Sequence, residues 1–269
     1  MKRGFLESTT VGFGRALTRA MLSERTARQP GLLQSLDPRV RVVGLFALVL
    51  ATALAHKIAA VAALFAGAVV IALLSRVSLV TLAKRVWLIV LGFTGVIAIP
   101  ALFVTPGRPI AMLGSTAITE QGLRTAILLI LRVETAVTFT TVLILCTPWT
   151  HLLKALRALR LSREAIAMLA MTYRYVFLLV ETASQMFESR RSRTVGVLRP
   201  VDQRRMATRT AGVLLSKTMA LSNEVYLAMQ SRGFRGEVPV LSDFRLTMWD
   251  FVGLIAFLLA GGGAVWMGR

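Results

Sequence analysis

The residues best suited to chemistry in this sequence are two groups of arginines. One lies in the segment 188–194 (ESRRSRT) and the other in the segment 230–236 (QSRGFRG), and Arg193 and Arg232 are 39 positions apart. A guanidinium stays charged, and its planar fork of N–H groups binds carboxylate and carbonyl oxygens in a fixed geometry. Such groups favour docking onto an acidic partner. A simpler role is also open, because a basic side chain at a helix C-terminus complements the helix dipole.

No residue pattern typical of catalysis or cofactor binding is found. The sequence has no glycine-rich phosphate loop followed by Lys-Ser/Thr, so we do not expect it to hydrolyse ATP. Its single cysteine, Cys146, cannot form an internal disulfide or a structural zinc site. The two histidines, His56 and His151, lie far apart in the sequence, with no cluster of cysteines or carboxylates nearby. We therefore expect a non-enzymatic protein with no metal site and no cofactor.

The composition indicates a basic membrane protein. Hydrophobic residues make up 55% of the 269 positions and the mean hydropathy is +0.68, which is too apolar for an ordinary soluble domain. The net charge of +19 is compatible with nucleic acid, an anionic lipid surface or an acidic protein as partner. The long uncharged runs favour membrane lipid or an acidic protein, rather than nucleic acid, as the partner. No zinc spacing or aromatic-rich RNA motif is present, so nucleic acid is not expected.

Five apolar runs are predicted to span the membrane. They cover residues 38–55, 58–74, 86–104, 123–146 and 248–267, with loops at 75–85 and 105–122. Asp37 caps the first helix and Pro38 takes its first position. Arg39 and Arg41 are expected to hold that end at the interface by extending their charges to water. In the last run, Gly261–Gly263 allow close contact between helices.

Residues 147–245, called here the basic block, carry 16 Lys and Arg against 7 Asp and Glu. The pattern predicts a short amphipathic helix after Pro148 and a second helix from a Ser162 cap to about Glu188. A third helix starts near Val201 and stops at Gly233. Of the 32 basic residues, 27 fall on one side of the predicted spans, which places the N-terminus and the basic block in the cytoplasm.

The predicted organisation is an all-α integral membrane protein with about five transmembrane helices and a cytoplasmic block of amphipathic helices. Its segments are an N-terminal amphipathic segment (1–36), a four-helix transmembrane region (37–147), the cytoplasmic helices (148–246) and a C-terminal transmembrane helix (247–269). A partly disordered tail is the alternative for the first segment. We expect a multi-pass protein of the plasma (inner) membrane.

Two pairs of charges lie within predicted helices. Arg132 and Glu134 fall inside the fourth span, where ionisable residues are functional candidates by default. Because they are two positions apart, they point to roughly opposite sides and should not pair. We expect them to anchor the span to other helices or to a partner. Arg174 and Glu181 are seven positions apart on one helix face, and pair either with each other or with neighbouring helices.

These residues resemble the T component of energy-coupling factor (ECF) transporters, in the cobalt-type branch (CbiQ/EcfT family), over nearly the whole chain. The end of the third helix, Gln230 to Phe234, looks like the second Ala-Arg-Gly motif of that family, with Ser231 in place of Ala. The first motif matches Ser192-Arg193-Thr194 or, in another register, Ser189-Arg190-Arg191. Supporting matches are Leu36-Asp37-Pro38-Arg39, Thr147-Pro148, and Tyr173-Arg174-Tyr175 with Glu181.

The resemblance implies a coupling subunit of an ECF-type ABC importer. In that family the T component is a membrane scaffold whose two coupling helices end in the arginine motifs and sit in grooves of two cytoplasmic ABC ATPase subunits. It also binds a membrane S component that captures the substrate, here of the cobalt or nickel type. The implied ATPase-coupling residues are Arg190, Ser192, Arg193, Thr194, Ser231, Arg232 and Gly233. The implied structural or partner residues are Asp37, Arg39, Arg132, Glu134, Arg174 and Glu181.

Three other functions stay open. The chain could be the T component of an importer for a vitamin. It could be a membrane enzyme acting on phosphorylated lipid, with the basic block binding phosphates. It could also be a structural protein that binds anionic lipid.

Overall fold

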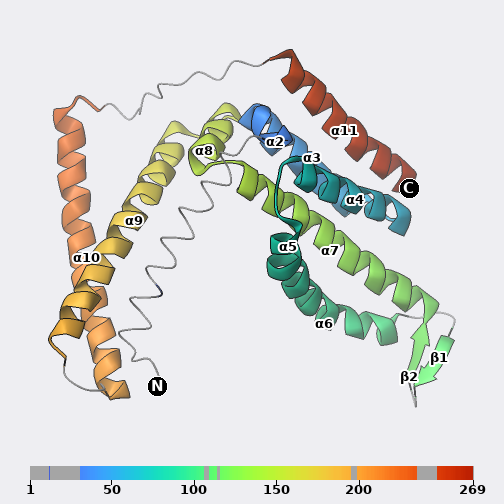
Figure 1. Cartoon of the computed structure of the whole chain (residues 1–269), viewed down its shortest axis with the longest axis horizontal. Helices are drawn as coiled ribbons and strands as arrows, with labels where there is room; N and C mark the ends of the chain where they lie inside the picture. Colours follow the sequence, from blue (N-terminus) through green and yellow to red (C-terminus); the bar gives the residue numbers. More distant parts are fainter. Residues whose placement is uncertain are drawn as a thin grey trace. The chain divides into compact units, whose positions relative to one another are not determined.

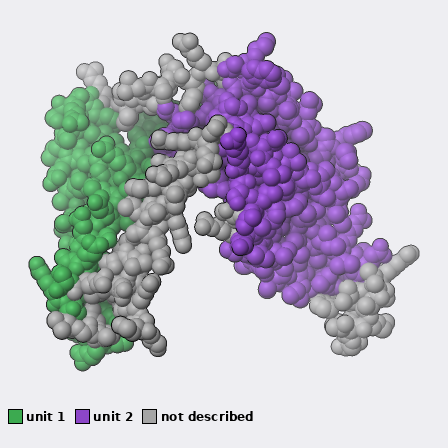
Figure 2. Space-filling model, viewed as in Figure 1, with its two compact units in different colours: residues 1–23, 156–242 green, residues 24–155, 243–269 purple. Residues whose placement is uncertain are grey.

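The structure is a computed structural model that describes Gly12 and residues 31–105, 109–113, 116–194, 199–234 and 247–268. In these residues the chain is helical apart from one short β-hairpin (Figure 1). It divides into two compact units (Figure 2). Unit 1 contains residues 1–23 and 156–242, and unit 2 contains residues 24–155 and 243–269. The predicted N-terminal segment at 1–36 lies largely outside the described residues.

Unit 2 contains the five apolar helices predicted for the membrane region. They are α3 (Pro38–Leu54), α4 (Ile58–Leu74), α6 (Leu88–Val104), α7 (Glu120–Cys146) and α11 (Met248–Gly268), preceded by the short α2 (Leu32–Ser35). By length and composition, three described helices can cross a membrane: α7, residues 163–190 of α9 (Arg163–Ser192), and α11. The helix α4 and residues 88–102 of α6 are shorter apolar helices. The chain is thus an all-α membrane protein, as the sequence predicts.

The start of α3 confirms the predicted cap. A side-chain oxygen of Asp37 accepts a hydrogen bond from the backbone N–H of Arg39 at 2.8 Å, and Pro38 takes the first helical position. At the start of α7, the hydroxyl of Thr119 accepts a hydrogen bond from the backbone N–H of Gly122 at 3.1 Å. A Cβ at Gly122 would lie 2.8 Å from the carbonyl oxygen of Ala101, so this glycine lets α7 approach α6.

The core of unit 2 forms where α3 and α4 pack against α7 and α11. Its largest fully buried side chains include Phe139 and Val142 of α7, with Leu45 and Leu48 of α3. Many apolar side chains on the outer faces of the helices are exposed, as expected for surfaces that contact lipid or other membrane helices.

Glycines bring α3 and α11 close together. A Cβ at Gly44 of α3 would overlap the ring of Phe257 in α11. A Cβ at Gly261 would lie 3.3 Å from the Cβ of Ala51, whereas Gly262 and Gly263 have open space at that position. The predicted close contact at the glycine run of α11 is therefore made by Gly261.

Gly44→Val is expected to destabilise the packing of α3 on α11, because the added side chain would enter the space of the Phe257 ring. Overpacking of this kind costs about 1–3 kcal/mol. The matched control is Gly67→Val in α4, where a Cβ meets nothing within 4 Å. Thermal unfolding of the detergent-purified variants, followed by tryptophan fluorescence, measures the effect. Equal melting temperatures for the two variants would contradict the expected role of Gly44.

Two connections differ from the sequence prediction. The segment 75–85 was expected to be a loop, but it contains α5 (Leu79–Leu82) and the start of a π-helical turn, η1 (Ala83–Trp87), that continues into α6. The loop predicted at 105–122 contains an antiparallel hairpin of β1 (Pro109–Leu113) and β2 (Thr116–Thr119). Unit 2 therefore has a π-helical turn before α6 and a small sheet between α6 and α7.

The helices of the basic block are α8 (Trp149–Ala158), α9 (Arg163–Ser192) and α10 (Pro200–Ser231). The helix α8 follows Pro148 directly and crosses the division between the two units. As predicted, Ser162 caps α9, because its hydroxyl accepts a hydrogen bond from the backbone N–H of Ala165 at 3.3 Å. The helices α9 and α10 contact each other within unit 1. The helix α9 ends at Ser192 rather than near Glu188, so Arg190 belongs to its last turn.

Candidate functional site

The C-terminal end of α10 has a well-defined backbone geometry. The N–H of Gly233 donates to the carbonyl of Gln230 at 2.9 Å, and the N–H of Phe234 donates to the carbonyl of Met229 at 3.0 Å. These two bonds form a Schellman motif, which needs a left-handed residue after the helix. Gly233 supplies it with φ = +76°, as the sequence predicts. The motif fixes the backbone at Arg232, whose side chain is exposed.

The C-terminal end of α9 is closed by hydroxyl groups instead of a glycine. The backbone carbonyl of Arg190 accepts hydrogen bonds from the N–H of Arg193 at 3.2 Å and from the hydroxyl of Thr194 at 2.8 Å. The hydroxyl of Ser192 donates to the carbonyl of Ser189 at 2.9 Å. Arg193 lies in the turn beyond the helix and is exposed, whereas Arg190 is half-buried in the last helical turn. The two registers left open by the sequence thus differ in exposure.

The arginines at these two ends have no acidic partner in the described part of the chain. An ion pair does join Arg199 to Asp202 near the start of α10, with Nε and Oδ2 3.0 Å apart. No comparable pair involves Arg190, Arg193 or Arg232 among the described residues. Their guanidinium groups are therefore available to carboxylates or carbonyls of another molecule.

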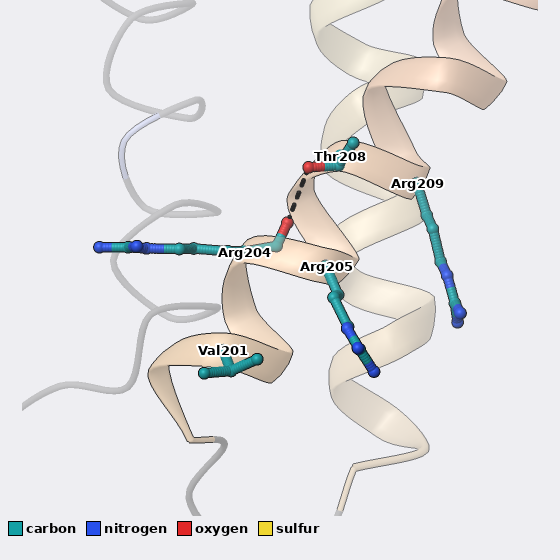
Figure 3. Close-up of a pocket in the computed structure, with 5 residues that line it drawn as sticks. All are labelled: Val201, Arg204, Arg205, Thr208 and Arg209. Atoms are coloured by element: carbon teal, nitrogen blue, oxygen red, sulfur yellow. Dashed lines mark hydrogen bonds between the residues drawn. The ribbon is translucent and has the colours of Figure 1, made fainter.

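A second basic feature lies in the first half of α10. A cavity of about 430 Å³ is lined by Val201, Arg204, Arg205, Thr208 and Arg209. Figure 3 shows Arg205 and Arg209 extending on one side of the helix, while Arg204 extends to the other. The hydroxyl of Thr208 donates to the carbonyl of Arg204 at 3.0 Å. The sequence predicts these arginines as part of a helix but does not indicate a cavity. Its chemistry suits a phosphate or carboxylate.

Arg41 forms a buried junction in unit 2, which corrects the expectation that it extends to water. Its side chain is only 4% exposed. Nη1 donates to the carbonyl of Cys146 at 2.8 Å, and Nε and Nη2 donate to the carbonyl of Leu36 at 2.9 and 2.7 Å. Nη2 also donates to the carbonyl of Gln34 at 3.1 Å. One guanidinium thus ties the start of α3 to the last residue of α7, where a cation also complements the helix dipole.

Asp250 links α11 to the same region and was not singled out as a site residue from the sequence. It is 5% exposed. Its Oδ1 accepts a hydrogen bond from the backbone N–H of Asp37 at 2.6 Å, and its Oδ2 accepts one from the N–H of Thr247 at 2.8 Å. Only its place near the start of an apolar helix could have indicated a capping role. Asp37 and Asp250 together join the beginnings of α3 and α11.

Arg132 and Glu134 both lie on α7, and their side chains point to different neighbours. Nη2 of Arg132 donates to the carbonyl of Ala55 at 2.6 Å, so Arg132 joins α7 to the residue that follows α3. Glu134 is 6% exposed and lines a different, mainly apolar cavity. The expectation that the two side chains do not pair is confirmed in this structure.

Arg174 and Glu181 are both exposed on α9, and the described residues contain no ion pair between them. The guanidinium carbon of Arg174 lies 6.0 Å from the centre of the Tyr175 ring, at the outer limit of a cation–π contact. Pairing between the two charges, one of the alternatives from the sequence, does not occur within the described residues.

The described residues also lack a cluster of His, Cys, Asp and Glu that could hold a metal ion. Unit 1 carries two exposed arginine ends and a basic cavity on a pair of helices that contact each other.

Comparisons with known proteins point to one family. The family model of the cobalt transport protein CbiQ matches residues 31–240. An uncharacterised protein of Methanocaldococcus jannaschii is 32% identical over 241 residues, which cover 88% of this chain and 81% of that protein. The cobalt transport protein CbiQ of Rhodobacter capsulatus is 29% identical over 175 residues, which cover 62% of this chain and 70% of that protein.

Proposed function

Because this chain belongs to the CbiQ cobalt transport protein family, we propose that it is the transmembrane coupling subunit of an ECF-type ABC importer for cobalt or nickel. In this proposal it transmits the motion of two cytoplasmic ATPase subunits to a membrane S component that captures the ion. The observation that carries the proposal is the pair of exposed arginine ends on α9 and α10, which lack acidic partners in the described chain.

The connection between α9 and α10 supports two separate docking points. The chain passes from Arg193 to Pro200 within a few residues, so the first arginine end lies near the start of α10. The second end lies one helix length away, because α10 has 32 residues and a rise of 1.5 Å per residue gives about 48 Å. Two ATPase subunits could each receive one end.

The exposed apolar faces of α9 and α10 support a role in transmitting motion between subunits. Apolar side chains such as Met168 of α9 and Leu215, Met219 and Leu227 of α10 are exposed. In the proposal, ATP-driven movement of the two ATPases displaces the arginine ends, and the helices carry that displacement to the S component resting on their apolar faces. A long helix suits this role because its backbone hydrogen bonds are satisfied internally.

The charge distribution supports a cytoplasmic position for these helices. If α9 crossed the membrane, as its length and composition would permit, the arginines of α9 and α10 would be divided between the two sides. The positive-inside rule disfavours that arrangement. We therefore propose the same domain plan as from the sequence, with residues 1–36 and 148–246 at the cytoplasmic face of the plasma membrane. Residues 37–147 and 247–269 cross it.

The alternative of an enzyme acting on phosphorylated lipid has one observation in its favour, the basic cavity of α10. A phosphoryl or prenyl transfer would need an acid–base group beside it. The nearest acidic residue in the sequence, Asp202, is already paired with Arg199. The cavity therefore fits anion binding better than turnover.

Affinity purification from mild detergent extracts of the native host tests the proposed function. We expect two ATPase subunits and one further membrane subunit to co-purify, ATP hydrolysis to require the ATPases, and deletion of this chain to abolish uptake of radioactive Co²⁺ or Ni²⁺. Uptake of a vitamin instead of a metal ion would favour the other importer. Turnover of a phosphorylated lipid by the isolated chain would overturn the proposal.

A further inference from the structure

An open cavity of about 440 Å³ lies among α4, η1, α6 and α7 of unit 2. Its lining is apolar apart from Glu134, and it includes the rings of Phe65 and Trp87 with Leu91 and Ile130. A cavity of this kind in the membrane region would normally be filled by lipid chains or by another helix. The acidic residue in its wall distinguishes it from an ordinary lipid-facing groove.

Among the described residues, Glu134 has no partner for its charge. Both carboxylate oxygens are shielded from water and lack a hydrogen bond in the described part of the chain. The nearest basic residue in the sequence, Arg132, directs its guanidinium to the carbonyl of Ala55. An unpaired carboxylate is costly to bury, and ionisable residues inside membrane proteins usually serve a partner or a pathway. The part of the chain that the structure describes thus leaves a buried acidic group without a hydrogen-bond partner.

The walls of the cavity are held in place by hydrogen bonds. The indole N–H of Trp87 donates to the hydroxyl oxygen of Thr138 at 3.0 Å, and that hydroxyl donates to the backbone carbonyl of Glu134 at 2.6 Å. The ring of Phe65 lies 5.5 Å from the Trp87 ring, centroid to centroid. Ala83 and Trp87 reach the cavity from the π-helical turn η1, a rare conformation that is frequent at functional sites.

The surface beside the cavity suits a close-packed helix. Leu88, Gly92 and Gly95 follow the i, i+4, i+7 spacing of one face of α6. A Cβ at either glycine would meet nothing within 4 Å, and Leu88 is 64% exposed. Small residues let membrane helices approach closely. A lipid acyl chain could fill the apolar walls, but it carries no group that pairs with a carboxylate.

We propose that this cavity receives a transmembrane helix of the partner membrane subunit, which places a lysine or arginine side chain against Glu134. The inference rests on the proposed function in one respect, that a membrane subunit accompanies this chain. It adds the position of the contact and the charge of the partner residue. The carboxylate of Glu134 reorients within the cavity to meet the incoming cation.

Photo-cross-linking in the co-purified complex tests the contact. A benzoylphenylalanine replacing Leu91 is expected to cross-link to one transmembrane segment of the membrane subunit, and that segment should contain a Lys or Arg. Glu134→Leu should lower the yield roughly tenfold or more, a loss of about 1.4 kcal/mol per factor of ten. Glu134→Lys combined with a basic-to-Glu change in the partner should restore it. The cross-linker at Leu50, an exposed position of α3, serves as the control that Glu134→Leu leaves unchanged.

Other outcomes overturn the inference. These are adducts with lipid alone, adducts with a second copy of this chain, a cross-linked helix without a basic residue, or a yield insensitive to Glu134→Leu. If the ATPases and the membrane subunit co-purify and uptake is normal under any of these outcomes, the docking site is wrong and the proposed function stands. If no ATPase or membrane subunit co-purifies at all, the proposed function itself fails.

Discussion

The double variant Arg193→Ala/Arg232→Ala is expected to abolish metal uptake while leaving the chain folded in the membrane. Both side chains are exposed and have no acidic partner in the described residues, so their removal should not destabilise the chain itself. In the complex, the acceptor group on each ATPase would lose the guanidinium that pairs with it, a loss of about 2–5 kcal/mol per site. Uptake, ATP hydrolysis and co-purification of the ATPases, measured on the same preparations, check this result.

The single variants identify the register of the first end. Arg193→Ala should weaken ATPase docking more than Arg190→Ala, because Arg193 is exposed beyond the helix and Arg190 is half-buried in the last turn of α9. Lys217→Ala, an exposed position in the middle of α10, is the control and should leave uptake unchanged. Normal uptake and co-purification by the double variant would show that these ends do not couple the subunits.

Arg41→Met is expected to be among the most destabilising single substitutions in unit 2. Methionine keeps much of the side-chain length but donates no hydrogen bond, so the carbonyls of Cys146, Leu36 and Gln34 lose their bonds to the guanidinium. Each buried group left unsatisfied costs about 1–3 kcal/mol, which predicts a total of roughly 3 kcal/mol or more. Thermal unfolding of the purified chain measures the loss.

Two further variants make the result specific. Arg41→Lys should recover only part of the stability, because one ammonium cannot reproduce the planar fork that reaches several carbonyls. Lys57→Met, at an exposed turn between α3 and α4, should unfold close to the original temperature. A melting temperature for Arg41→Met equal to that of Lys57→Met would show that the buried junction adds nothing to stability.

Local patterns predicted much of the fold. The limits of α4, the cap at Asp37, the cap at Ser162 and the stop at Gly233 each depend on residues within one or two helical turns, and the structure contains all four. The arginine ends of α9 and α10 were also located from local sequence. Their binding to ATPase subunits involves other molecules, so it stays a prediction.

Long-range contacts explain most of what the sequence did not predict. Arg41 meets the carbonyl of Cys146 across 105 positions, and Asp37 meets Asp250 across 213. A basic residue beside an apolar run looks like an interface anchor until the element that covers it is known. The π-helical turn at Ala83–Trp87 needs only one extra residue per turn and has no residue marker of its own.

The hydrogen bond from the backbone N–H of Asp37 to the carboxylate of Asp250 can form only late in the synthesis of this protein. At typical synthesis rates of about 5–20 residues per second, the start of α3 leaves the ribosome roughly 10–40 s before its partner does. During that interval Gly44 also lacks the ring of Phe257 against which it packs. If α3 crosses the membrane as proposed, it stays there during that interval without its contacts to Asp250 and Phe257. Insertion factors and membrane proteases then have a period in which to recognise an incomplete chain.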